Sequence, residues 1–225
     1  MSAHDQITKL RERMTEDVLQ RTLPFWIHHA VDREHGGIYG LITGDMRVWK
    51  DEPKMVVICA RVLWTYSAAY RLFGKPEFLE MANWARDYLL GPFWDKANSG
   101  LFWQVSHKGE VTSDRKQTYG QAFALYALSE HFRATGQAES LERAIEIFEL
   151  IERHCFDPRF GGYFEARGRA WQTLAEMRLS PRDMNSPKSM NTLLHVMEAY
   201  TNLLRAWPDA RLKQQQARLL VAERH

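Results

Sequence analysis

Cysteine, long apolar runs and clusters of positive charge are all scarce in this sequence of 225 residues. The two cysteines, Cys59 and Cys155, lie far apart in apolar surroundings, which argues against a disulfide framework and a thiolate zinc site. No run of about 18 apolar residues occurs, and the N-terminus lacks the apolar segment of a secretion signal. The net charge is only +2 without a basic run, so we expect no nucleic-acid or membrane partner. A cytoplasmic location fits these absences best.

Metal- and nucleotide-binding motifs are missing as well. The adjacent His28 and His29 have no third ligand at metal spacing, and no Gly-rich phosphate loop stands between a strand and a helix. We therefore expect neither a metal nor any other cofactor.

Aromatic residues, by contrast, make up 12% of the chain and include eight tryptophans. Hydrophobic residues, aromatics included, make up 45% of the chain, which is ample for a core at this length. Rings that line a cavity can stack on the C–H faces of sugars. Core packing and sugar stacking are equally reasonable interpretations of the tryptophans near expected loops, namely Trp26, Trp49, Trp64, Trp94, Trp103 and Trp171.

Apolar residues recur with helical spacing along the whole chain, and no comparable run alternates as a strand would. The spacing predicts an all-α protein that forms a single domain over residues 1–225. About seven helices are expected, near residues 4–30, 54–73, 77–91, 116–135, 138–154, 187–206 and 209–222.

Three connections between these helices share the pattern D-x3-[GS]-G-x-[YF]. They begin at Asp32, Asp95 and Asp157, which are 63 and 62 residues apart. Glycine permits the left-handed backbone of a tight turn, and the residues that follow can pair as short strands. The sequence therefore predicts a repeat of roughly 60 residues, each a helix pair with a short hairpin-like excursion.

Repeated helix pairs build either an open solenoid, with periods of about 34 to 47 residues, or a closed α/α toroid with longer repeats and loops on one face. The long period and the hairpin loops favour the toroid. Closure takes about six pairs, and the expected helices supply only about three and a half, so an incomplete (α/α)6 ring is predicted.

Superposing the repeats places Arg61, Phe123 and His195 at one equivalent position, at intervals of 62 and 72 residues. The position is expected near the start of each inner helix, facing the ring axis. Tyr119 and Asn191 lie four residues before Phe123 and His195, on the same helix face. A guanidinium and an imidazole are costly to bury unpaired, so a solvated polar cavity is one interpretation. The other is that Arg61 pairs with a carboxylate and His195 is a hydrogen-bonded core residue.

Three longer stretches resemble the cellobiose 2-epimerases of the N-acylglucosamine 2-epimerase superfamily. They are residues 116–130 (KQTYGQAFALYALSE), 157–166 (DPRFGGYFEA) and 188–201 (KSMNTLLHVMEAYT), and the likeness extends from about residue 15 to 208. The resemblance implies an (α/α)6 barrel that epimerises C2 of the reducing-end sugar in β-1,4-linked disaccharides. Cellobiose would become glucosyl-mannose and lactose would become epilactose, without a cofactor.

The resemblance also implies a mechanism in which the sugar ring opens, C2 loses its proton to give a cis-enediolate, and a proton returns to the other face. Two histidines transfer these protons, because an imidazole with a pKa of about 6.5 both takes and gives protons near neutral pH. Arg61 and Tyr119 match residues that bind substrate oxygens, and Asn191 matches a positioning residue. His195 matches the residue that binds a hydroxyl and assists ring opening.

The chain departs from the family pattern in two ways. The family motif M-N-T-H-x-H carries Leu193 here in place of its first histidine. The two proton-transferring histidines of the family lie in later repeats, and His225 matches neither, so we expect this chain to be incomplete for catalysis. An unfinished ring would also expose apolar helix flanks, which favours self-association.

Two functions of other classes stay open. Without the later histidines, the chain could be a non-catalytic helical module that binds a carbohydrate or a protein. A toroidal glycosidase would instead need two carboxylates across the cavity, for which Glu165 and Asp183 are candidates, although solvated loop carboxylates are much commoner.

Overall fold

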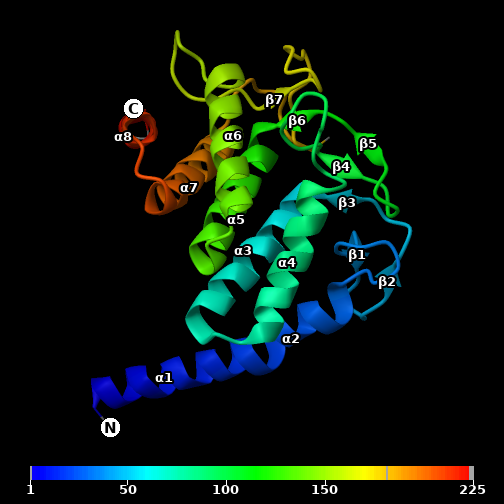
Figure 1. Ribbon diagram of the computed structural model, residues 1–225, viewed down its shortest axis with the longest axis vertical. Coiled ribbons are helices and arrows are strands. Elements are labelled where there is room, and N and C mark those ends of the chain that lie inside the picture. Colours follow the sequence, from blue (N-terminus) through cyan, green and yellow to red (C-terminus); the bar gives the residue numbers. More distant parts are fainter. Residues whose placement is uncertain (1, 181, 223–225) are drawn as a thin grey trace.

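The computed structural model describes residues 2–180 and 182–222 and arranges the central helices in two layers (Figure 1). In the inner layer α5 (Thr118–Thr135) packs against both α3 (Val56–Phe73) and α7 (Met190–Ala206). In the outer layer α4 (Pro76–Leu90) covers α3, and α6 (Ala138–His154) covers α5. The prediction of an all-α protein built from helix pairs is confirmed.

The N-terminal helix is less regular than its apolar spacing predicted. After α1 (Ala3–Asp17) the chain continues through the π-helical segments Val18–Thr22 and Trp26–Ala30, which flank the short α2 (Leu23–Phe25). Helix α1 starts at a capping box formed by Ser2, buries no side chain and extends away from the two layers (Figure 1). Among the described residues, no helix is both long and apolar enough to cross a membrane.

Short strands precede the inner helices α3 and α5, which begin two residues later than expected, and α7 begins three residues later than expected. The strand β3 (Lys54–Met55) pairs with β4 (Gln104–Val105), which also pairs with β5 (Val111–Ser113), and all these pairs are antiparallel. Before α5, β6 (Lys116–Gln117) pairs with β7 (Ala166–Arg167), again antiparallel. The strands gather at the end of the molecule where α3 and α5 begin (Figure 1). A separate hairpin is formed by β1 (Leu41–Ile42) and β2 (Val48–Trp49).

Each repeated loop is closed by its own aspartate in the same way. In the second loop, Asp95 Oδ1 accepts hydrogen bonds from the backbone N–H groups of Ala97 and Asn98, and Oδ2 accepts one from Lys116 Nζ at 3.0 Å. The carboxylate thus satisfies the turn while the lysine joins it to the start of the next inner helix.

The other two repeats copy this ion pair. Asp32 binds Lys54 at 2.7 Å, and Asp157 binds Lys188. The lysines are spaced by 62 and 72 residues, the same intervals that separate the candidate site positions. The three Asp–Lys pairs therefore repeat in space as well as in sequence.

The hydrophobic core extends from Leu23 to Leu219, the latter on α8 (Ala210–Ala222), which packs on α7. Fully buried alanines such as Ala60 and Ala124 line the inner helices, where small side chains allow close packing. The assignment of residues 1–225 to one domain stays a prediction, and His225 lies outside the described residues.

The ten extra residues of the third repeat form a loop between β7 and α7. Within this loop the ring of Trp171 is buried, stacks on His154 with ring centroids 5.0 Å apart, and donates from Nε1 to the Asn98 carbonyl at 2.9 Å. Arg169 adds a contact to Asp95 at 3.3 Å. Trp171 therefore holds two loops together and serves packing.

Candidate active site

The three inner helices bring the equivalent residues Arg61, Phe123 and His195 to one place. The guanidinium carbon of Arg61, on α3, lies 4.6 Å from the centroid of the Phe123 ring on α5. The centroid of the His195 ring, on α7, also lies 4.6 Å from the Phe123 centroid. These three residues line a cavity of about 310 Å³ together with Trp64, Thr65, Tyr126 and Glu198. Superposition of the repeats thus predicted a spatial cluster.

Tyr119 joins this cluster from the first turn of α5. Its ring meets His195 edge-on at 4.8 Å and Phe123 at 5.0 Å. The side chain is half-buried, so the phenol can donate a hydrogen bond near the imidazole while its ring packs on the aromatic wall.

Arg61 is exposed and stands over the Phe123 ring. A guanidinium over an aromatic face keeps its planar set of N–H donors free for oxygen ligands while the ring favours its charge. Among the described residues, no carboxylate forms an ion pair with Arg61, so the interpretation that it merely pairs with an acid is not supported.

Asn191 does not join the other three predicted residues. It lies exposed in the first turn of α7, one residue before Thr192, which is buried and hydrogen-bonded to Glu165 at 2.7 Å. Within the described part of the chain, no hydrogen bond or ring contact connects Asn191 with Arg61 or His195. Its substrate-positioning role stays a prediction.

Leu193 stands where the family motif has a histidine, and it is half-buried against the hydrophobic core. His195 is turned instead toward the aromatic wall formed by Tyr119 and Phe123. The two positions of the motif therefore face different surroundings. Because Leu193 packs on the core, the position of His195 depends on its contacts with Tyr119 and Phe123.

Glu198 is the site residue that the sequence analysis missed. Its Oε2 lies 2.6 Å from His195 Nδ1, one helical turn further along α7. The spacing of three residues on a predicted helix was the signal that could have found it. Trp64 and Tyr126 also went unrecognised as a pair, although they occupy the positions equivalent to Glu198 and stack at 5.2 Å with an interplanar angle of 13°.

Burial raises the pKa of the Tyr126 phenol, with the nearby carboxylates of Glu198 and Glu130 adding to the effect. The phenol is therefore a neutral hydrogen-bond donor over the physiological range.

The two candidate carboxylates of a glycosidase do not flank this cavity. Glu165 is buried, and burial raises its pKa although Thr192 donates to it. Asp183 is exposed and accepts a hydrogen bond from the backbone of Ser180 at 2.9 Å. Neither residue lines the cavity shared by Arg61 and His195, so the structure gives the glycosidase hypothesis no support at this site.

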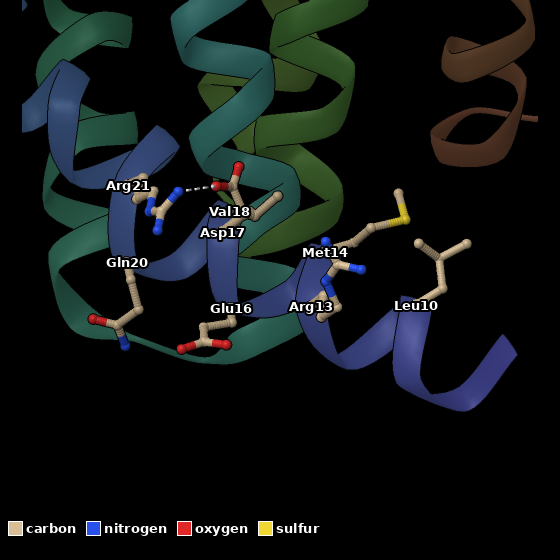
Figure 2. A pocket seen from close by; sticks show the side chains of 8 residues that line it. All are labelled: Leu10, Arg13, Met14, Glu16, Asp17, Val18, Gln20 and Arg21. Carbon is tan, nitrogen blue, oxygen red and sulfur yellow. Dashed lines mark ion pairs between the residues drawn. The ribbon is translucent and has the colours of Figure 1, made fainter. Parts of the chain in front are cut away.

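A larger hollow of about 580 Å³ lies beside α1 and the π-helical segment that follows it (Figure 2). Its lining comes from one continuous stretch of helix, including Arg13, Glu16 and the Asp17–Arg21 ion pair drawn in Figure 2. It has no aromatic wall and no groups converging from separate elements, so its volume does not make it a binding site. No group of three His, Cys, Asp or Glu side chains able to hold a metal is found among residues 2–180 and 182–222.

Paired helix layers, loops at one end and a polar cavity on the inner wall define a protein of the α/α-toroid class. The family model described as "N-acylglucosamine 2-epimerase (GlcNAc 2-epimerase)" matches residues 25–209. The chain belongs to this family.

Relatives agree with this assignment. The chain is 47% identical to the cellobiose 2-epimerase of Bacteroides fragilis over 92% of its own length and 53% of that protein. Its structure is similar to that of cellobiose 2-epimerase from Bacillus thermoamylovorans B4167, with a TM-score of 0.90 and 39% identity. The similarity covers 94% of this chain and 54% of that protein. A cellobiose 2-epimerase structure from Spirochaeta thermophila gives a TM-score of 0.91, 36% identity and coverage of 98% and 55%.

The chain thus spans about half the length of these relatives. The predicted part of an α/α toroid is confirmed, and so is the resemblance to the cellobiose 2-epimerases. The homologues are isomerases that act on sugars.

Proposed function

We propose that this chain forms the sugar-binding wall of an enzyme that epimerises C2 of the reducing-end sugar in β-1,4-linked disaccharides through a cis-enediolate. The observation that carries the proposal is the meeting of three inner helices at one cavity, which Arg61 and His195 line together with Phe123. Tyr119 packs edge-on against His195 beside this cavity. Cellobiose and lactose are the proposed substrates because the relatives are cellobiose 2-epimerases.

His195 is suited to ring opening. Its imidazole takes the proton from O1 of the sugar hemiacetal as the C1–O5 bond breaks, and then returns that proton to O5. The electrons of the O1–H bond form the C1 carbonyl, and those of the C1–O5 bond remain on O5. The histidine is unchanged by the full step.

Arg61 is suited to hold the oxygens of the open sugar. Its charge and its N–H donors favour the negative charge that develops on the enediolate more than they favour the neutral sugar, which is the condition for catalysis. Tyr119 adds a hydroxyl group beside His195. For Asn191 we propose a substrate-positioning role. We place the two proton-transferring histidines in the half of the relatives that this chain does not span, so turnover requires that half.

The proposal is tested by incubating the chain with cellobiose in deuterium oxide and following C2 by NMR. Binding without deuterium at C2 is expected for these 225 residues alone, and His195→Asn should weaken that binding. Deuterium at C2 would contradict the proposed location of the proton-transferring histidines. Absence of binding, with the helical fold intact, would contradict the proposed sugar site.

A non-catalytic binding module is the second candidate, because a cavity lined by Trp64, Phe123 and Tyr126 could bind a sugar without acting on it. It predicts the same binding but no gain of activity when the remaining half of a relative is supplied in trans. Appearance of glucosyl-mannose in that mixture would reject the module, and appearance of free glucose would instead reveal a glycosidase.

Self-association over exposed flanks is also proposed. Leu10 and Met14 lie on the same side of α1 (Figure 2), and with Ile7, Leu72 and Phe73 they line an almost wholly apolar groove. Light scattering should report a dimer that Leu10→Glu dissociates, whereas a monomeric chain would contradict the proposal. The even charge distribution and the two buried free cysteines support a cytoplasmic location.

A further inference from the structure

The contact between His195 and Glu198 distinguishes α7 from the other inner helices. Glu198 Oε2 lies 2.6 Å from His195 Nδ1, while the side chains are 52% and 21% exposed. Two aromatic rings limit the imidazole further, since Tyr119 meets it edge-on at 4.8 Å and Phe123 meets it at a tilt at 4.6 Å. The ring is therefore held by two aromatic neighbours and, at one nitrogen, by a carboxylate.

The carboxylate decides which ring nitrogen is free. An ionised carboxylate only accepts hydrogen bonds, so the short contact places the proton on Nδ1. The neutral imidazole then has its lone pair on Nε2, and within the described residues no hydrogen-bond partner contacts that nitrogen. Nε2 is left as the atom that can meet a sugar hydroxyl.

Comparison of the three repeats gives an independent reason to connect the two residues. The equivalent positions that carry Arg61, Phe123 and His195 are followed three residues later by Trp64, Tyr126 and Glu198. In the first two repeats these later positions hold stacked aromatic rings. A carboxylate occurs only in the repeat that carries the imidazole, so the acid accompanies the histidine and is not a general feature of the inner wall.

We infer that Glu198 is a positioning residue that fixes His195 in the Nδ1–H tautomer and so presents Nε2 as the proton acceptor for the sugar hydroxyl. The inference rests on the proposed function only for the identity of the ligand, because the tautomer itself is a property of the free protein. In this arrangement Glu198 exchanges no proton with the sugar. It acts through the imidazole.

The alternative is an ordinary surface ion pair between residues three apart on a helix. Such a pair would contribute little and would leave the tautomer of His195 free to change. The two possibilities therefore differ in what happens to the imidazole when the carboxylate is removed, and not in whether the protein folds.

The test uses the full chain labelled with 15N-histidine, with the His195 signals assigned by His195→Asn. Long-range 1H–15N spectra above the titration range of the imidazole should show mainly the Nδ1–H tautomer in the unmodified chain. In Glu198→Gln and Glu198→Ala the population should move toward Nε2–H. Glu149→Gln removes another helix-surface carboxylate, which pairs with Arg211, and should leave the His195 signals unchanged.

Cellobiose titration gives the second readout. Glu198→Gln should weaken binding about fivefold, the factor that corresponds to ~1 kcal/mol for a partly exposed pair. An Nε2–H tautomer in the unmodified chain, or an unchanged tautomer in both Glu198 variants, would overturn the inference. A tautomer that changes as expected in a chain that binds no disaccharide would support the role of Glu198 while rejecting the proposed substrate. Circular dichroism identifies any variant that fails to fold, and the other Glu198 variant then decides.

Discussion

Removal of the Asp95 carboxylate should destabilise the fold far more than the same change at Asp157. Asp95 and Lys116 both have side chains that are 0% exposed, whereas Asp157 and Lys188 are 9% and 29% exposed. Asp95→Asn leaves the Lys116 ammonium buried without its counter-charge, which typically costs about 3–5 kcal/mol. Asp157→Asn leaves a partly solvated lysine, and a loss of about 1–2 kcal/mol is expected.

Burial already lowers the pKa of Lys116 to about 8, despite the opposing hydrogen bond and charge of Asp95. Without that carboxylate the lysine can escape the penalty by losing its proton. Loss of the Lys116 proton at pH 7 costs at most about 5 kcal/mol of folding free energy, because a lysine in the unfolded chain titrates near pH 10.4. A lysine whose folded pKa is depressed gains relative stability as pH rises toward the unfolded value, so the loss in Asp95→Asn should shrink between pH 7 and pH 10.

Urea unfolding followed by circular dichroism and tryptophan fluorescence measures both losses, and coincident transitions would justify a two-state analysis. Asp95→Asn combined with Lys116→Met should recover part of the stability, because the unpaired charge is gone. Equal losses in the two aspartate variants, or a loss in Asp95→Asn that grows with pH, would refute the argument from burial.

Three further changes test other parts of the structure. Ser99 has a left-handed φ of 58°, so Ser99→Gly should raise the free energy of unfolding by about 0.5 kcal/mol and with it the urea midpoint. A lower midpoint would exclude strain at this residue. Burial raises the pKa of Glu152 although Tyr163 and Tyr200 both donate to it at 2.6 Å. The Glu152 carboxyl therefore binds a proton more readily in the folded state than in the unfolded state. The stability of the unmodified chain relative to Glu152→Gln should increase as pH falls below neutrality. Unfolding curves at several pH values would show this increase or disprove it. Arg61→Lys keeps the charge but loses the planar set of donors, so calorimetry should show cellobiose binding about tenfold weaker with an unchanged fold; equal affinity would remove Arg61 from the site.

Helical periodicity and the repeated loops predicted the helix pairs because both signals are local. The starts of α3, α5 and α7 were placed two to three residues early, since the lysine-containing segments before them are extended. In β3 and β6 the extended backbone pairs with strands from distant loops, and helical spacing carries no information about such pairing.

Equivalence between repeats predicted which residues of the inner helices lie close together. It brought Arg61 and His195 to the same cavity. The rule that residues four apart share a face placed Tyr119 beside Phe123 and His195. Asn191 also lies four residues before His195 within α7, and its role in the site stays a prediction. The contribution of Glu198 required the distance between the imidazole and the carboxylate.

The loop before α7 was the least predictable segment. Its residues show no period and its conformation depends on partners in another repeat, as in the contact of Trp171 with the Asn98 carbonyl. Tertiary contacts of this kind have no counterpart in local sequence patterns.

The Asp–Lys pairs explain why Arg61, Phe123 and His195 keep equivalent positions along their helices although the third repeat has a longer loop. Lys54, Lys116 and Lys188 each precede Arg61, Phe123 or His195 by seven residues, of which the last six belong to the inner helix. The extra residues of the third repeat all lie before Lys188, so the number of residues between the lysine of the ion pair and His195 equals that in the other repeats. An insertion after Lys188 would rotate His195 away from the rings of Tyr119 and Phe123. The ion pairs therefore act as fixed starting points for the inner helices, and the relative positions of Arg61, Phe123 and His195 follow from them.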